Sequence, residues 1–303
     1  MPTRRHVISS LAWSLAGLAL APSRAAFAAD EMQTRPVPAS GERLPVIGMG
    51  TADSFNVGDG PEDREPLREV MRRFFAGGAA LIDTAPSYGR AEAVIGDLLA
   101  ELNLRPRAFI ATKIGASGRA AGLEQFQRSL RLLRTDKVEL LQVHNLVDWQ
   151  TQLALINELK AQGKTRYSGV THYTESGHDE LARVVRAARP DFLQVNYSVI
   201  SRGAESAVFP LARELGVAVL VNRAFDDGRL FARVKDKPLP PWAAEAGIGS
   251  WAQAFLRFAL SHPAVTVVIP ATGKPDRQSD NLKAGQGPML TAQQRQSLIE
   301  TVG

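Results

Sequence analysis

The sequence contains no cysteine among its 303 residues. This absence excludes thiol catalysis, iron–sulfur clusters and thiolate zinc sites, and no disulfide can stabilise the fold. The five histidines show no spacing typical of a metal site, so we expect no bound metal. Stability must therefore come from a hydrophobic core, which a chain of this length with 45% apolar residues can bury.

The sequence also lacks any lysine- and arginine-rich block interleaved with aromatic residues, as nucleic-acid-binding surfaces often have. The formal net charge is +5, but the first 28 residues contain three arginines and no acidic residue. Without that segment the net charge falls to +2. The basic balance therefore reflects the N-terminal segment, and we expect no nucleic-acid partner and no binding to a membrane surface.

Residues 1–28 have the pattern of an export signal. Arg4 and Arg5 precede a modestly apolar run over 7–21 that is too short to span a bilayer comfortably, and Ala26-Phe27-Ala28 has a small-x-small cleavage pattern. The arginine pair predicts the twin-arginine route, so the export machinery is an expected partner and the periplasm the expected location. An ordinary general-secretory signal and an uncleaved anchor are the alternatives. After cleavage we expect no stable membrane insertion.

The rest of the chain is predicted to hold a polar, proline-rich linker over 29–42 and one folded domain over 43–303. In that domain, short apolar runs alternate with amphipathic stretches, as strands alternate with helices in α/β proteins. The expected strands are 44–51, 80–85, 107–114, 138–145, 166–171, 192–198, 217–222 and 265–271. This alternation predicts a single (β/α)8 TIM barrel, with an open doubly wound sheet as the alternative. Gly48–Asp53 lacks the final glycine of G-x-G-x-x-G, which counts against that alternative.

Polar side chains stand at or just past the ends of the second, third and fourth expected strands: Asp83 and Tyr88, Lys113, and His144. In a (β/α)8 barrel such positions converge on one mouth, where chemistry takes place. A phenol has a pKa of about 10, and the ammonium of Lys113 beside Tyr88 would lower that pKa by stabilising the phenolate. Asp83 would hold Lys113 by an ion pair, and His144 would bind a carbonyl oxygen. The group predicts proton delivery to a carbonyl compound.

The motifs around these residues resemble those of the aldo-keto reductase superfamily, NADPH-dependent carbonyl reductases on a (β/α)8 barrel. The resemblance covers about residues 43–284. The segments that carry it are Ile82-Asp83-Thr84-Ala85-x-x-Tyr88-Gly89, Thr112-Lys113, Gln142-Val143-His144, Leu44–Thr51, Leu193–Tyr197 and Ile269–Leu282. The resemblance implies that Asp83, Tyr88, Lys113 and His144 form the catalytic tetrad of a reductase domain. It also implies that the cofactor is NADP and that the substrate is a small carbonyl compound.

A cofactor site along the barrel mouth follows from the same resemblance. Gln194 matches the residue that holds the nicotinamide carboxamide, and Gly50 and Thr51 match the turn beside the cofactor. Arg277 matches the arginine at the adenosine 2′-phosphate. The residues expected around the adenosine are Thr272, Asp280 and Asn281.

The sequence departs from the family pattern at three places. Thr171-His172 stands where the family usually has Ser-Asn, and both residues are expected to contact the carboxamide. Asn222-Arg223 stands where a tyrosine often stacks on the nicotinamide, and Arg223 is expected at the pyrophosphate, since a guanidinium suits phosphate oxygens. Ala271 occupies a position that is usually cationic, and Lys274 can substitute for it.

Residues 226–249 interrupt the alternation with prolines, glycines and charges, so we expect a long loop there. Because the segment follows the seventh expected strand, it should rise over the barrel mouth and close over the pyrophosphate. A free periplasmic pool of NADPH is not expected, so the cofactor should be tightly retained.

Two other functions are alternatives to a reductase. One is a nicotinamide-nucleotide-binding barrel that acts as a redox sensor or auxiliary subunit with little turnover. The other is a barrel glycosidase, which would need a second carboxylate about 5–10 Å from Asp83. No strand end offers an obvious second acid, and Lys113 suits an ion pair with Asp83 better.

Overall fold

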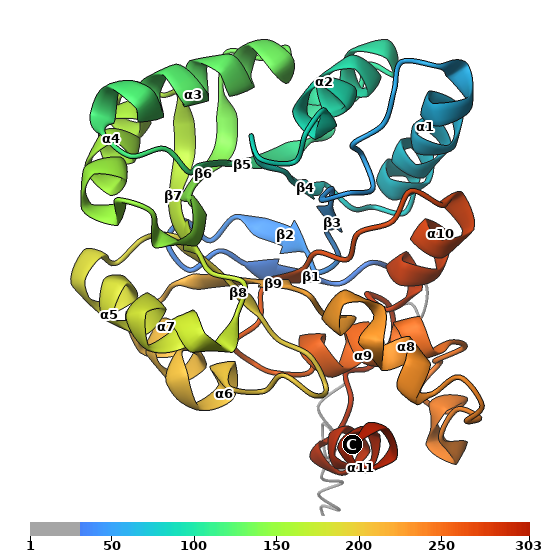
Figure 1. Cartoon of the computed structure of the whole chain (residues 1–303). Helices are drawn as coiled ribbons and strands as arrows, with labels where there is room; N and C mark the ends of the chain where they lie inside the picture. Colours follow the sequence, from blue (N-terminus) through green and yellow to red (C-terminus); the bar gives the residue numbers. More distant parts are fainter. Residues whose placement is uncertain (1–30) are drawn as a thin grey trace, which may run out of the picture.

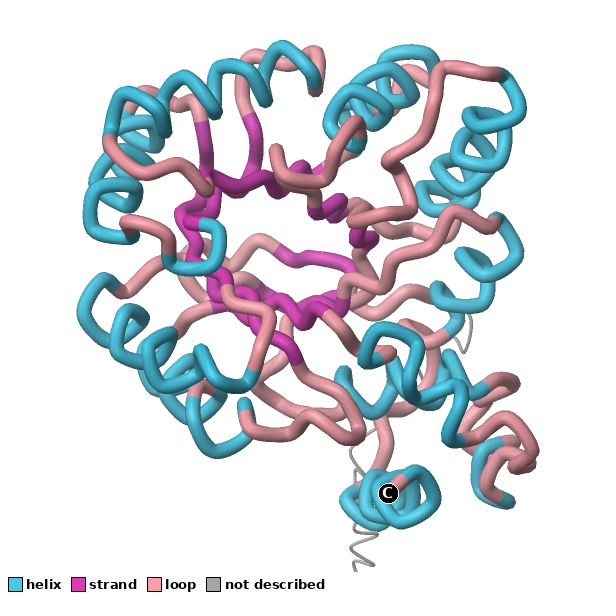
Figure 2. The backbone as a smooth tube through the Cα atoms, in the orientation of Figure 1, coloured by secondary structure: helices cyan, strands magenta, loops and turns pink. Residues whose placement is uncertain are grey.

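Eight parallel strands form a ring in the computed structural model, which describes residues 31–303 (Figure 2). Neighbouring strands in the ring follow one another in the sequence. The strands are β3 (Met49–Gly50), β4 (Leu81–Asp83), β5 (Phe109–Ile114), β6 (Val138–Val143), β7 (Thr165–Thr171), β8 (Phe192–Asn196), β9 (Ala218–Asn222) and β10 (Val267–Val268). Parallel bridges from Ile47 to Val268 and from Gly50 to Ala271 join the first strand to the last. The prediction of a (β/α)8 barrel is therefore confirmed.

Helices follow the strands and cover the outside of the ring (Figure 1). They are α1 (Pro61–Ala76), α2 (Ala91–Glu101), α3 (Arg119–Leu132), α4 (Trp149–Ala161), α5 (His178–Ala188), α6 (Ala204–Ala207), α7 (Phe209–Leu215), α8 (Arg229–Arg233), α9 (Trp251–Leu260), α10 (Pro275–Lys283) and α11 (Ala292–Val302). Short 3-10 helices cover Arg105–Arg107, His144–Leu146, Glu175–Gly177, Asp226–Gly228 and Pro241–Ala243. Side chains cap the starts of two of the described α-helices. The Ser250 side chain accepts from the Gln253 N–H at the start of α9, and Thr291 and Gln294 form a capping box on α11.

The side chains of each strand alternate between the inside of the barrel and the helices, because a strand repeats every two residues. The outward residues join the large core under the helices, as Ile82, Ile110 and Leu193 do. Inward residues in the lower barrel form a second apolar cluster: Leu81, Phe109, Ala111, Leu140, Tyr167, Phe192, Ala218, Leu220, Val267 and Ile269. Continuing this alternation toward the carboxyl ends of the strands gives polar residues: Asp83, Lys113, Gln142, Thr171, Gln194 and Asn222. One face of the same strands therefore supplies both the core and the site.

An antiparallel hairpin closes the end of the barrel where the strands begin. It consists of β1 (Thr34–Pro36) and β2 (Arg43–Pro45), which are seen inside the ring in Figure 1. Val37 and Leu44 are buried in the inner apolar cluster. The segment expected to be a linker over 29–42 is therefore part of the fold from Thr34 onward. It folds because the apolar Val37 covers the open end of the barrel.

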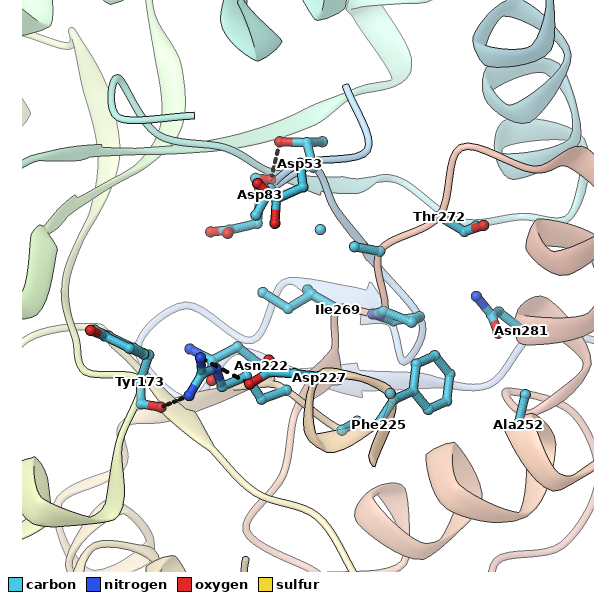
Figure 3. Close-up of a pocket in the computed structure, with 18 of the residues that line it drawn as sticks. Asp53, Asp83, Tyr173, Asn222, Phe225, Asp227, Ala252, Ile269, Thr272 and Asn281 are labelled. Atoms are coloured by element: carbon cyan, nitrogen blue, oxygen red, sulfur yellow. Dashed lines mark hydrogen bonds and ion pairs between the residues drawn. The ribbon is translucent and has the colours of Figure 1, made fainter. Parts of the chain in front are cut away.

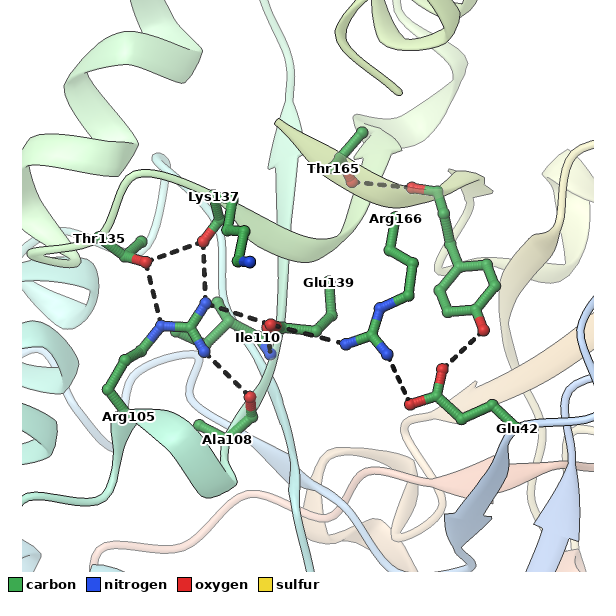
Figure 4. A network of polar contacts seen from close by, with 10 residues as sticks. Glu42, Arg105, Ala108, Ile110, Thr135, Lys137, Glu139, Thr165 and Arg166 are labelled. Carbon is green, nitrogen blue, oxygen red and sulfur yellow. Dashed lines mark hydrogen bonds and ion pairs between the residues drawn. The ribbon is translucent and has the colours of Figure 1, made fainter. Parts of the chain in front are cut away.

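A polar network attaches this hairpin to the barrel (Figure 4). The Glu42 carboxylate accepts from Arg166 at 2.9 Å and from the Tyr167 hydroxyl at 2.6 Å. Glu139 is buried and accepts the backbone N–H of Ile110 at 2.7 Å. Arg105 and Arg166 both pair with the Glu139 carboxylate, so this network connects the turn before β2 with β5, β6 and β7.

Residues 226–249 hold short helices instead of the long loop expected from the sequence. The segment folds because Leu230 and Val234 are buried, which anchors α8 against the rest of the domain. Within residues 31–303, no helix has the length and apolar character needed to cross a membrane. The predicted signal over 1–28 lies outside the described residues.

Candidate active site

The predicted tetrad comes together at the carboxyl ends of the strands. Lys113 and Asp83 are both buried, and the Lys113 ammonium donates to Asp83 Oδ2 at 2.7 Å and to the carbonyl oxygen of Thr84 at 2.8 Å. The ammonium lies 5.0 Å from the centre of the Tyr88 ring. The His144 ring meets the Tyr88 ring edge-on, with 6.1 Å between their centres. The phenol, ammonium, carboxylate and imidazole are therefore within one site.

The hydroxyl of Tyr88 is protonated in this site. Burial raises its pKa above the ordinary value, and the charge of Lys113 only partly opposes that shift. The expectation that Lys113 brings the pKa of Tyr88 below its usual value is therefore corrected, because desolvation of the phenolate outweighs the attraction. The resting phenol still holds the proton that an acid catalyst must donate.

Lys113 keeps its positive charge despite complete burial. Burial lowers the pKa of its ammonium, but the Asp83 carboxylate, together with Tyr88, raises it by more, so the net shift is upward. His144 shows the opposite behaviour: burial, and then the charge of Lys113, lower the pKa of its imidazole to about 4. His144 is therefore neutral near pH 7 and can donate or accept a hydrogen bond without a change of charge.

Amide side chains complete the surroundings of Asp83. Its Oδ1 accepts from Gln194 at 2.7 Å and from Gln142 at 3.2 Å, and Gln194 Oε1 accepts from Asn222 at 3.3 Å. Because a carboxylate only accepts, both glutamines must turn an NH2 group toward it. One NH2 hydrogen of Gln194 is thus committed to Asp83, in addition to the carboxamide role implied by the family resemblance.

A pocket of about 1090 Å³ runs from the tetrad across the barrel mouth to α10. Figure 3 shows Asp83 on one side of it and Asn281 and Ala252 on the other. The predicted site residues that line it are Gly50, Thr51, Asp83, Tyr88, His144, Thr171, Gln194, Asn222, Arg223, Thr272, Arg277, Asp280 and Asn281. Lys113 lies beneath the pocket surface, fully buried.

His172 lies outside the pocket, contrary to expectation. Thr171 faces the barrel interior, so strand alternation turns the next side chain away. The His172 ring stacks on Tyr173 and accepts the backbone N–H of Thr174 at 3.3 Å. The Thr171 hydroxyl is also in use, since it donates to the Val143 carbonyl and accepts the Asn145 N–H.

Arg223 makes contacts within the protein at the pocket rim. Its guanidinium lies 4.7 Å from the centre of the Tyr173 ring, donates to the Tyr173 carbonyl at 3.2 Å and pairs with Asp227 at 3.0 Å. Figure 3 shows these contacts joining the end of β7 to the segment after β9. The expected role of Arg223 at a pyrophosphate would require it to leave or share these partners.

Several pocket residues were not found from the sequence. The aromatic side chains of Tyr173, Phe225, Phe231 and Trp251 supply much of the apolar wall. Phe231 lies in the segment over 226–249 that was expected to be a loop, and Phe225 directly precedes it, so these two phenylalanines were the available signal. Asp53 also lines the pocket, from the turn after β3.

The far end of the pocket lies at the start of α10. Asp280 accepts from Ser250 and from Gln253, both at 2.6 Å, which ties α10 to the start of α9. Arg277 is exposed on the first turn of α10, and within residues 31–303 its guanidinium makes no ion pair. A helix N-terminus with a free arginine suits an anionic group.

The barrel and the tetrad together define the class of (β/α)8-barrel oxidoreductases. Residues 46–301 match the model of the "Aldo/keto reductase family", and the chain belongs to that family. The family assignment expected from the motifs is confirmed.

Curated relatives are similar over most of the domain. "Methylglyoxal reductase YeaE" of Escherichia coli is 29% identical over 79% of this chain and 86% of its own length. "NADH-specific methylglyoxal reductase" of the same organism is 26% identical over 65% of this chain and 68% of its own length. "Aldo-keto reductase YhdN" of Bacillus subtilis is 28% identical over 63% of this chain, and the match spans only 61% of that relative.

Solved structures share the fold over nearly the whole domain. An aldo-keto reductase from Klebsiella pneumoniae in complex with NADPH has a TM-score of 0.75 and 25% identity, covering 89% of this chain and 96% of the other. The aldo-keto reductase AKR11C1 from Bacillus halodurans (holo form) has a TM-score of 0.73 and 23% identity, covering 90% and 97%.

We expect the free energy of unfolding to fall as the pH drops from about 6.5 toward 4, in part through His144. Folded His144 takes up its proton only near pH 4, whereas the unfolded chain does so near its ordinary value, so protons favour the unfolded state in that window. The neutral His144 ring therefore contributes about 3 kcal/mol to the free energy of unfolding above pH 6.5, and this contribution is lost by pH 4.

Urea unfolding at both ends of this range measures the effect. His144→Gln cannot titrate, so it should lose less stability on acidification than the unsubstituted protein. The pKa of His262 is also lowered to about 4 by burial, but that residue is present in both proteins and its effect cancels. Equal losses in the two proteins would contradict the prediction.

Proposed function

We propose that this protein reduces aldehydes or ketones to alcohols with NADPH, with Tyr88 as the general acid. The observation that carries the proposal is geometric: Tyr88 lines the pocket, and its ring lies 5.0 Å from the ammonium of Lys113, which is buried in an ion pair with Asp83. The Klebsiella structure in complex with NADPH supports the choice of cofactor.

The protonation state of each residue determines its role in the proposed reaction. Neutral His144 donates a hydrogen bond to the carbonyl oxygen and orients it between the two rings. Tyr88 then transfers its proton to that oxygen, and the Lys113 ammonium stabilises the phenolate that remains. Asp83 holds Lys113 in place. When bound, the reduced nicotinamide supplies the hydride for the carbonyl carbon. In the reverse direction, Tyr88 accepts the proton of the alcohol.

The pocket fits a dinucleotide phosphate. It reaches from the tetrad to α10, and Arg277 offers at the far end a cation that has no ion pair within the described residues. Asn222 Oδ1 in the pocket wall is buried and has no partner within residues 31–303, as expected of a site that completes its hydrogen bonds with a ligand. A relative is named as NADH-specific, so the preference for NADP rests on Arg277 and the neighbouring Lys274.

Turnover should depend on the Tyr88 hydroxyl. NADPH oxidation is followed spectroscopically against a panel of aldehydes, ketones and sugars. Tyr88→Phe should lower kcat by about a hundredfold to ten-thousandfold, because the acid is lost while the ring remains. Tyr167→Phe is the matched control, since that hydroxyl binds Glu42 at the opposite end of the barrel. If the unsubstituted protein binds NADPH but reduces nothing, the sensor or auxiliary role is favoured instead.

Selection of NADP over NAD should depend on Arg277. Arg277→Gln should weaken NADP+ binding by about ten- to a hundredfold, because a charge-assisted hydrogen bond to the 2′-phosphate is lost, and leave NAD+ binding unchanged. Fluorescence titration of the tryptophans measures both dissociation constants. Arg131→Gln, an exposed arginine on α3, controls for the change in net charge. A parallel loss of NAD+ affinity would place Arg277 elsewhere than at the 2′-phosphate.

We also propose that the protein is exported by the twin-arginine route, with the segment after β9 retaining its cofactor. Arg4→Lys together with Arg5→Lys should keep the protein in the cytoplasm on cell fractionation, whereas Arg24→Lys should not. Continued export of the double variant would indicate the general-secretory route. The periplasmic protein should carry bound nucleotide, and its absence after gentle purification would count against tight retention.

A further inference from the structure

Three of the four acidic side chains that line the pocket have a polar partner. Asp83 pairs with Lys113, and Asp227 pairs with Arg223. At the far end, Asp280 accepts two hydrogen bonds from α9 and lies on the same helix as Arg277. Asp53 differs from Asp83, Asp227 and Asp280, since neither an ion pair nor a hydrogen bond joins its carboxylate to another group within residues 31–303.

Asp53 lies at the tetrad end of the pocket. Figure 3 shows it beside Asp83, on the side away from Asn281 and Ala252. Its negative charge is near enough to Tyr88 to raise the pKa of the phenol slightly. Because His144 is neutral and Lys113 is neutralised by Asp83, the uncompensated charge at this end of the pocket is negative.

The backbone presents the Asp53 side chain from a left-handed turn. Asp53 has φ +59°, and the turn is closed by the Phe55 N–H donating to the Thr51 carbonyl. The following residues fix this turn to the one that carries Tyr88, since Asn56 accepts the Arg90 N–H at 3.0 Å. The backbone that carries the exposed Asp53 side chain is therefore fixed relative to the turn that carries Tyr88.

We infer that Asp53 determines specificity by selecting carbonyl substrates according to charge. This inference rests on the proposed reductase function. It states that substrates bearing an ammonium or several hydroxyl groups are favoured. Substrates bearing a carboxylate or phosphate near the carbonyl are disfavoured. An ammonium gains attraction to the carboxylate, and a hydroxyl can donate to it, whereas an anion meets repulsion. Asp53 does not take part in the proton transfer.

Three aldehydes of one shape test the inference: 4-(trimethylammonio)benzaldehyde, 4-nitrobenzaldehyde and 4-formylbenzoate. Their intrinsic reactivities differ, so the quantity compared is the change in each kcat/KM on substitution. Asp53→Asn keeps the shape of the side chain, and asparagine tolerates a positive φ as well as aspartate does, so the variant should fold. The cation-to-anion ratio is the kcat/KM for 4-(trimethylammonio)benzaldehyde divided by the kcat/KM for 4-formylbenzoate. Asp53→Asn should lower this ratio by about tenfold, mostly through KM.

Asp236→Asn is the matched control. Asp236 is exposed, lies outside the pocket and has no ion pair within the described part of the chain, so this variant makes the same change in net charge. It should leave the ratio unchanged. In the unsubstituted protein, added salt should reduce the ratio, as screening of a charge interaction requires.

The outcomes separate the two proposals. If no aldehyde is reduced by the unsubstituted protein, the reductase function fails. If all three are reduced but Asp53→Asn leaves the cation-to-anion ratio unchanged, the assignment of Asp53 is wrong and the reductase function stands. Equal losses for all three aldehydes, accompanied by weaker NADP+ binding, would also overturn the assignment, because Asp53 would then serve the cofactor.

Discussion

The ion pair between Lys113 and Asp83 is the interaction around which the mouth of this barrel is arranged. Both groups are withdrawn from water, and removing one partner of such a pair typically costs about 3–5 kcal/mol because the other charge is left buried and unpaired. The surrounding residues supply the remaining hydrogen-bond partners of the two charged groups. Gln142 and Gln194 donate to Asp83, and the Thr84 carbonyl accepts from Lys113. The need to keep a buried cation therefore restricts which residue types can stand around Lys113.

The two-residue repeat of the strands explains how one sequence provides both this site and its support. Leu81, Phe109 and Leu140 fill the lower barrel, and two positions further along the same strands come Asp83, Ala111 and Gln142. Only the last inward position of most strands is polar. Substrate and cofactor thus meet the rim of a packed core, and the apolar layers below keep water from the ion pair.

The sequence allowed the barrel and the tetrad to be predicted because both depend on local, periodic signals. Lys113 and His144 could be placed from strand ends alone. The closing hairpin was missed because Val37 is a single apolar residue among prolines, and only the tertiary context shows that it caps the barrel. Arg223 could be placed at the mouth, but its partner Tyr173 belongs to another loop, and no local pattern reports that contact. His172 was expected beside the carboxamide from the family pattern, whereas strand alternation turns its side chain away from the pocket that Thr171 lines.

The raised pKa of Tyr88 agrees with a role for Lys113 in acid catalysis. A phenol in a desolvated pocket keeps its proton, which is the protonation state that the proposed reduction requires at its start. The ammonium matters most when the proton leaves, because only then does a negative charge appear beside it. Attraction between the two charges is then strengthened by the same burial that raised the pKa at rest. In the proposed mechanism, desolvation and the neighbouring cation therefore act on different stages of one step. Desolvation holds the proton until a carbonyl oxygen is in place, and the cation stabilises the phenolate once the proton has moved.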